Sequence, residues 1–135
     1  MNPMLQTLHH KQTAMQTFVD RLLHSPVGRN IIKIVHYGST ARDDWHEESD
    51  IDLLIIATGN LKTVENTCSD LSFDVMLEKG ELVQPMVYCP DAYRHPHYFL
   101  TRVQKSGKEI YVLDDENARK NEAADLLDLA RRYAR

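Results

Sequence analysis

The 135-residue sequence contains few of the residues on which small secreted or cysteine-metal domains depend. It has 2 cysteines, Cys68 and Cys89, and neither belongs to a Cys-x-x-Cys pattern. We therefore expect no disulfide framework and no cysteine-based zinc site, but two free thiols in a reducing compartment. Internal repeats and low-complexity tracts are also missing, which argues against a repeat protein.

A long apolar run and an excess of positive charge are absent as well. No apolar stretch of roughly 18 residues and no charged-then-apolar leader is found, so we expect a cytoplasmic protein with no membrane partner. Lysine and arginine total 16 and aspartate and glutamate total 20, which gives a net charge of −4. A protein that follows a nucleic acid backbone is usually basic, and nucleic acid is therefore not an expected partner.

What remains is the composition of an ordinary folded domain. Hydrophobic residues make up 42% of the chain and charged residues 27%. A chain of this length is typical of one domain that buries roughly two thirds of its unfolded surface. The composition therefore argues against extensive disorder.

Hydrophobic spacing and turn residues predict a helix followed by a small sheet. Pro3 opens an apolar stripe at helical spacing that continues to about residue 24. Runs of β-branched and apolar residues predict strands, and Pro85 favours an edge position for one of them. The expected helices cover 3–24, 39–44, 62–69, 90–107 and 114–135, and the expected strands cover 31–37, 50–57, 72–79, 82–88 and 109–113. This order is typical of a mixed α/β (α+β) domain in which helices flank a small mixed β-sheet.

A Gly-Ser pair follows the strand expected over 31–37, and an Asp-x-Asp pair opens the strand expected over 50–57. Gly38 permits a close approach of the backbone to a phosphate, and Ser39 offers an N–H group and a hydroxyl at the start of a short helix. Asp50 and Asp52 alternate in a strand and therefore share a face. Two carboxylates about 4 Å apart repel by roughly 4 kcal/mol at an effective dielectric constant near 20, so the pair predicts a cation such as Mg²⁺.

A third carboxylate is expected on the neighbouring strand. Two-metal transfer of a nucleotidyl group needs one further ligand, and Asp74 lies in an apolar stretch of the strand predicted over 72–79. The alternatives are a solvated strand position for Asp74, a plain turn for the Gly-Ser pair and a surface position for Arg42. The predicted site residues are Asp50, Asp52 and Asp74 for catalysis and metal binding, and Gly38, Ser39 and Arg42 for nucleotide binding.

These motifs carry a resemblance to a known family. Gly38-Ser39, a gap of ten residues, Asp50-x-Asp52 and the later Asp74 resemble the nucleotidyltransferase superfamily of DNA polymerase beta. More narrowly, the chain is similar to the stand-alone minimal nucleotidyltransferases, from the first helix to Tyr111. The resemblance implies a polymerase-beta-like domain over 1–113, followed by a helix over 114–135 that is a candidate for partner docking. It also implies that Asp74 is both a metal ligand and the base that faces the acceptor.

The resemblance implies a reaction and a partner. It implies transfer of a nucleoside monophosphate, usually AMP from ATP, at a site with two magnesium ions. It also implies a HEPN-domain toxin as partner, since the minimal members are often antitoxins that modify such a toxin by adenylylation. Two alternatives stay open, a small-molecule nucleotidyltransferase of the aminoglycoside type and a binding-only antitoxin with a vestigial site. Many relatives have glycine where this chain has Asp43, in an acidic loop over 43–48. Homo- and hetero-oligomers are both compatible with the sequence.

Histidines near these motifs are interpreted as structural. His36, two residues before Gly38, is expected to be a core or strand-edge residue. His95 and His97 lack the companions that a metal site needs and are expected at the surface.

Overall fold

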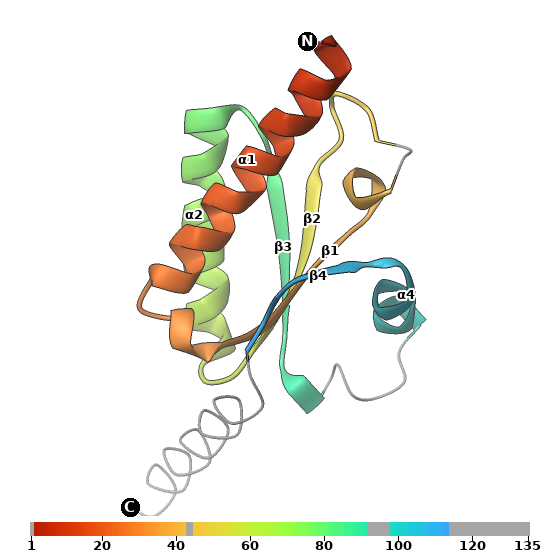
Figure 1. Ribbon diagram of the computed structural model, residues 1–135. Helices are drawn as coiled ribbons and strands as arrows, with labels where there is room; N and C mark the ends of the chain where they lie inside the picture. Colours follow the sequence, from red (N-terminus) through yellow and green to blue (C-terminus); the bar gives the residue numbers. More distant parts are fainter. Residues whose placement is uncertain (1, 43–44, 92–97, 114–135) are drawn as a thin grey trace, which may run out of the picture.

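The structure is a computed structural model that describes residues 2–42, 45–91 and 98–113. In this part of the chain helices alternate with strands (Figure 1). They are α1 (Pro3–His24), the 3-10 helix η1 (Gly28–Asn30), β1 (Ile31–Tyr37), the 3-10 helix η2 (Ser39–Ala41), β2 (Ile51–Ala57), α2 (Leu61–Lys79), β3 (Val83–Tyr88), α4 (Tyr98–Ser106) and β4 (Lys108–Val112). The predictions that fall on 114–135, and on His95 and His97, lie outside the described residues.

The strands form one mixed sheet in the order β3-β2-β1-β4. β1 pairs antiparallel with both β2 and β4, whereas β2 and β3 are parallel. The small mixed sheet flanked by helices is therefore confirmed, and so is the edge position of the strand that contains Pro85. A proline is tolerated there because the outer side of an edge strand needs no donor.

Helix α1 forms where the apolar stripe predicted it. The Asn2 side chain accepts a hydrogen bond from the Met4 N–H group at 2.8 Å, and Pro3 occupies the first turn. Ala14, Phe18 and Leu22 recur at a spacing of four residues and are fully buried. The helix therefore packs one continuous stripe against the sheet.

Helix α2 corrects the prediction of a strand over 72–79. The helix begins at the Asn60 side chain, which accepts from the Thr63 N–H group, and ends at Gly80 in the left-handed conformation. Its buried face is made by residues at helical spacing, namely Val64, Cys68, Ser72 and Val75. The short helix expected over 62–69 therefore continues to Lys79 and takes Asp74 with it.

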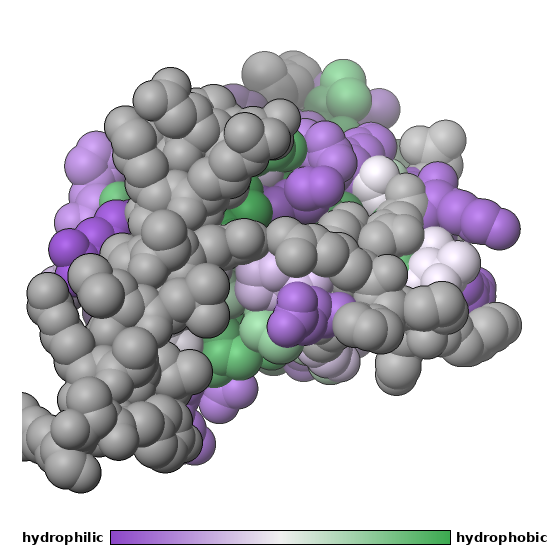
Figure 2. All heavy atoms as spheres, turned by 90° about the horizontal axis from the view of Figure 1, so that it is seen from below, coloured by the Kyte–Doolittle hydropathy of each residue, from purple (hydrophilic) through white to green (hydrophobic). Residues whose placement is uncertain are grey.

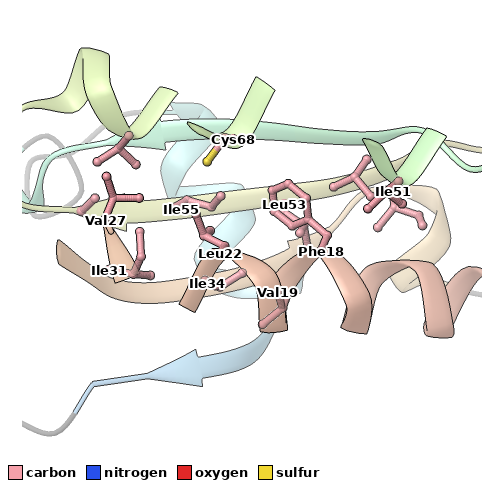
Figure 3. Packing of buried hydrophobic residues seen from close by; sticks show 14 of the residues in the cluster. Phe18, Val19, Leu22, Val27, Ile31, Ile34, Ile51, Leu53, Ile55 and Cys68 are labelled. Atoms are coloured by element: carbon pink, nitrogen blue, oxygen red, sulfur yellow. The ribbon is translucent and has the colours of Figure 1, made fainter. Parts of the chain in front are cut away.

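Two hydrophobic cores cover the two faces of the sheet. Helices α1 and α2 pack on one face, where Phe18 and Leu22 lie against Leu53 and Ile55 of β2 and Cys68 of α2 points toward the same layer (Figure 3). Helix α4 packs on the opposite face over a smaller cluster, whose members are Val35, Leu54, Ile56, Leu100 and Val103. Because alternate side chains of β2 point to opposite faces, Asp52 shares the α4 side with Leu54.

Some apolar side chains remain at the surface. Seen from below, hydrophobic areas lie between hydrophilic ones (Figure 2). The large exposed residues of the described part include Met4, Leu5, Phe73, Leu77 and Val112. Among the helices described, none has the length and apolar character needed to cross a bilayer.

Candidate active site

A turn after β1 places glycine against a carboxylate. Gly38 has φ +79°, a conformation that side chains with a Cβ rarely adopt. A Cβ added at this position would overlap the Oδ2 atom of Asp52. Two separate features therefore require glycine here, the backbone conformation and the close approach of the Asp52 carboxylate.

The 3-10 helix η2 follows this glycine and contacts both β1 and β2. The Ala41 N–H group donates to the Gly38 carbonyl at 3.2 Å, and the Arg42 N–H group donates to the Ser39 carbonyl at 3.1 Å. These bonds hold Ser39, which is half-buried, beside the end of the sheet.

His36 anchors the same turn from β1. Its Nε2 atom is 2.8 Å from the Thr40 hydroxyl oxygen, and both side chains are buried. Burial, assisted by the positive charge of Lys108, lowers the pKa of His36 to about 4. The imidazole is therefore neutral near pH 7, and the interpretation of His36 as a buried strand residue is confirmed.

Asp50 and Asp52 meet at the start of β2. Burial raises the pKa of Asp52, and the negative charge of Asp50 raises it further. The Arg42 guanidinium acts in the opposite direction and lowers the pKa of the same carboxyl group. Three of the predicted site residues thus interact electrostatically, and Gly38 touches one of them.

A buried lysine from α1 fixes the chain just before Asp50. Lys11 is 2% exposed, and its Nζ atom donates to the Ser49 carbonyl at 2.9 Å and to Glu81 Oε2 at 2.7 Å. The Ile51 N–H group donates to the Leu82 carbonyl at 2.9 Å. Lys11 therefore ties together the two segments that lead into the parallel strands β2 and β3.

Tyr37 lies beside Asp52 on the α4 side of the sheet. The two residues are Cα partners in the β1–β2 ladder, and the Tyr37 hydroxyl donates to the Met86 sulfur of β3 at 3.2 Å. The Tyr37 ring packs edge-on against Phe99, with ring centroids 5.5 Å apart. Burial, then the charge of Asp52 and the neighbouring Tyr88, raises the pKa of Tyr37 to about 12, so its hydroxyl keeps its proton near pH 7.

The structure does not bring Asp74 to this site. Asp74 is exposed on α2, where its charge acts on Arg21 of α1. Both helices cover the sheet face opposite to Asp52. The prediction that Asp74 completes the carboxylate set from a neighbouring strand is therefore wrong.

The remaining donors fit one hard divalent cation. Asp50 and Asp52 supply carboxylate oxygens, which Mg²⁺ prefers. Within the described residues, no group of three or more His, Cys, Asp or Glu side chains is arranged to hold a metal ion. The described side chains therefore suit a single cation and do not complete a two-metal set.

Sequence reasoning missed two neighbours of the carboxylates. Lys11 gave no signal, because a lysine within an amphipathic helix is ordinarily solvated. Gln84 is the Cα partner of Asp52 on β3, and it lies within the edge strand that the sequence predicted over 82–88. Only the mistaken strand over 72–79 concealed this pairing.

Comparisons with known proteins find a matching family model and a similar sequence. The family model described as "Polymerase beta, Nucleotidyltransferase" matches residues 27–116, which is more than half of the chain. The chain is 31% identical over 104 residues to a Methanocaldococcus jannaschii protein that is provisionally named a protein adenylyltransferase, and the match covers 76% of this chain and 99% of that protein.

Solved structures show the same fold. A provisionally assigned nucleotidyltransferase from Sulfolobus solfataricus has a TM-score of 0.52 at 19% identity, covering 82% of this chain and 88% of that chain. A toxin–antitoxin complex with AMP-PNP contains a chain with a TM-score of 0.51 at 20% identity, covering 87% of this chain and 91% of that chain. At these identities the two structures indicate a shared fold and nothing finer.

Proposed function

Because the chain belongs to the polymerase beta nucleotidyltransferase family, and is an enzyme of that class, we propose that it transfers AMP from ATP to a hydroxyl group of a partner protein. The partner is the toxin of a toxin–antitoxin pair, of the HEPN type, and this chain is the antitoxin. The M. jannaschii relative named a protein adenylyltransferase supports the protein acceptor, because the match spans almost all of that relative. The toxin–antitoxin complex with AMP-PNP supports the nucleotide and the partner.

The observation that carries the proposal is the contact between Gly38 and the Asp52 carboxylate. This contact places a candidate phosphate-binding turn directly beside a candidate metal ligand. Transfer from a nucleoside triphosphate needs such an arrangement, because the metal has to reach the bound phosphates. Ser39 then supplies hydrogen bonds to the phosphates, and Arg42, whose charge already acts on Asp52, supplies a cation beside them.

The reaction forms a bond between the acceptor oxygen and the α-phosphorus of ATP. The bond from that phosphorus to the bridging oxygen of pyrophosphate breaks, and the hydroxyl proton of the acceptor leaves to water. A magnesium ion on Asp50 and Asp52 would offset the negative charge of the phosphates. The chain itself positions the triphosphate against the Gly38 turn and holds it beside Tyr37, whose hydroxyl stays protonated.

The test is adenylylation of the co-purified or genetically adjacent partner. Wild-type protein, ATP labelled at the α-phosphate and magnesium are mixed with the partner, and the mass of one AMP is sought on it. Asp52→Asn keeps the side-chain shape, removes the charge and should abolish labelling. Asp74→Asn is the matched control, because this exposed aspartate lies on the other side of the sheet and its loss should leave labelling unchanged. Labelling of aminoglycosides in place of the partner would refute the protein acceptor.

A binding-only antitoxin is the second candidate. The observation that favours it is the lack of a third carboxylate near Asp50 and Asp52 among the described residues. Neutralisation of the partner by Asp52→Asn at the wild-type level, with no label transferred by either protein, would select this candidate.

A further inference from the structure

The parallel register of β2 and β3 puts a neutral residue beside the carboxylate pair. Asp52 and Gln84 are Cα partners, so they lie on adjacent strands about 5 Å apart and on one face of the sheet. The contact between the Tyr37 hydroxyl and the Met86 sulfur supports this orientation independently, because Tyr37 is itself the partner of Asp52. Tyr37, Asp52 and Gln84 therefore form a row across three strands.

Other acids of the described part do not take this place. Asp74 is on the far side of the sheet, and Glu81, the nearest acid before β3, is 12% exposed and ion-paired to the buried Lys11. Gln84 by contrast is exposed, on the same face as Asp52. Its amide oxygen can serve as an uncharged metal ligand, whereas a carboxylate at this position would bring a third negative charge to the site.

We propose that Gln84 sets the metal capacity of this site: it occupies the position from which an acid would complete a three-carboxylate set, and it thereby limits the described donors to one divalent cation. The proposal rests on the proposed use of a cation by Asp50 and Asp52. It assigns to a single edge-strand residue the difference between a one-cation and a two-cation site.

The experiment measures Mg²⁺ binding without any acceptor, by calorimetry and by the dependence of thermal unfolding on magnesium at constant ionic strength. Gln84→Asp introduces the carboxylate, and Gln84→Glu does so with the shape of glutamine preserved. We expect at least one of them to bind two Mg²⁺ ions per chain where wild type binds one, and to bind Mg²⁺ about tenfold or more tightly. A unit charge about 5 Å from a divalent ion has an effect of this size even at the dielectric constant of water. In the absence of magnesium both variants should unfold at a lower temperature, because a third negative charge is then uncompensated.

Gln84→Asn is the matched control, since it has the size of aspartate without its charge, and its Mg²⁺ affinity should equal that of wild type. The proposal is overturned if both acidic variants bind Mg²⁺ as wild type does, or if Asp52→Asn leaves the wild-type response unchanged. These outcomes are independent of the proposed function. Tighter Mg²⁺ binding by Gln84→Asp without AMP transfer by any variant would retain this inference and reject the enzyme reaction.

Discussion

Replacing Lys11 by methionine should lower the free energy of unfolding by about 3–5 kcal/mol, which is the usual effect of removing one partner of a buried ion pair. Lys11 is 2% exposed and Glu81 is 12% exposed, and their side chains are 2.7 Å apart. The substitution keeps most of the apolar stem but leaves the Glu81 carboxylate and the Ser49 carbonyl without their donor. A loss of this size is a large fraction of the 5–15 kcal/mol that is typical of a folded domain.

The protein contains its own control for this prediction. Arg21 and Glu78 join α1 to α2 at the same distance of 2.7 Å, but their side chains are 40% and 49% exposed. Arg21→Met should therefore cost far less stability than Lys11→Met, because solvent screens an exposed ion pair. Urea unfolding of both variants, followed by circular dichroism, measures the difference. Equal losses would show that burial does not determine the strength of these ion pairs and would refute the reasoning.

A double variant separates the missing partner from the lost attraction. In Lys11→Met/Glu81→Leu no buried charge remains unpaired, so most of the lost stability should return. A residual loss of about 1–2 kcal/mol is expected from the unpaired Ser49 carbonyl. Failure of the double variant to recover any stability would indicate that the loss comes from the unpaired Ser49 carbonyl and not from the unpaired Glu81 carboxylate.

Two further predictions concern the phosphate turn. Gly38→Ala and Gly80→Ala both force alanine to adopt a positive φ, which costs about 1–3 kcal/mol. Only Gly38→Ala should also abolish nucleotide binding, because a Cβ at Gly38 meets Asp52 whereas one at Gly80 meets nothing within 4 Å. Equal nucleotide affinities of the two variants by calorimetry would contradict the contact with Asp52. His36 has a pKa of about 4 in the folded chain, compared with 6.5 ordinarily, so the unfolded chain binds the proton first as the pH falls. The free energy of unfolding should therefore decrease by about 3 kcal/mol between about pH 6.5 and about pH 4. Urea titrations at several pH values measure this decrease, which should be missing in His36→Gln.

The sequence predicted most strands because their signals are local. The β-branched run before Tyr37 and the apolar run after Asp52 are each bounded by turn residues and require no knowledge of the rest of the chain. The stretch 72–79 was misread because Phe73, Met76 and Leu77 are apolar but exposed, so they imitated a buried strand. The helical period of the buried residues that lead up to Val75, together with Gly80 as a C-terminal cap, was the better signal.

The site was predictable only where it is contained in one hairpin. Gly38, Asp50 and Asp52 belong to the antiparallel strands β1 and β2 and the connection between them, so the short spacing in sequence translates directly into proximity. Lys11 reaches the segment before Asp50 from a helix on the opposite face of the sheet, and Gln84 reaches the Asp52 face from an edge strand. The first position depends on tertiary packing and the second on strand register. A pattern of residue types within one segment specifies neither the tertiary packing nor the strand register.

The path of the chain between β2 and β3 decides where a third ligand has to come from. Parallel neighbours require a crossover, and here the crossover helix α2 packs on the α1 side of the sheet. Every residue of that helix is consequently separated from Asp52 by the sheet itself, however close it is in sequence. Within the described chain, the next strand that can bring a ligand to the Asp52 face is β3, at the partner position occupied by Gln84. No other acid of the described residues takes that position, so the magnesium dependence of the proposed AMP transfer should differ between wild type and Gln84→Asp.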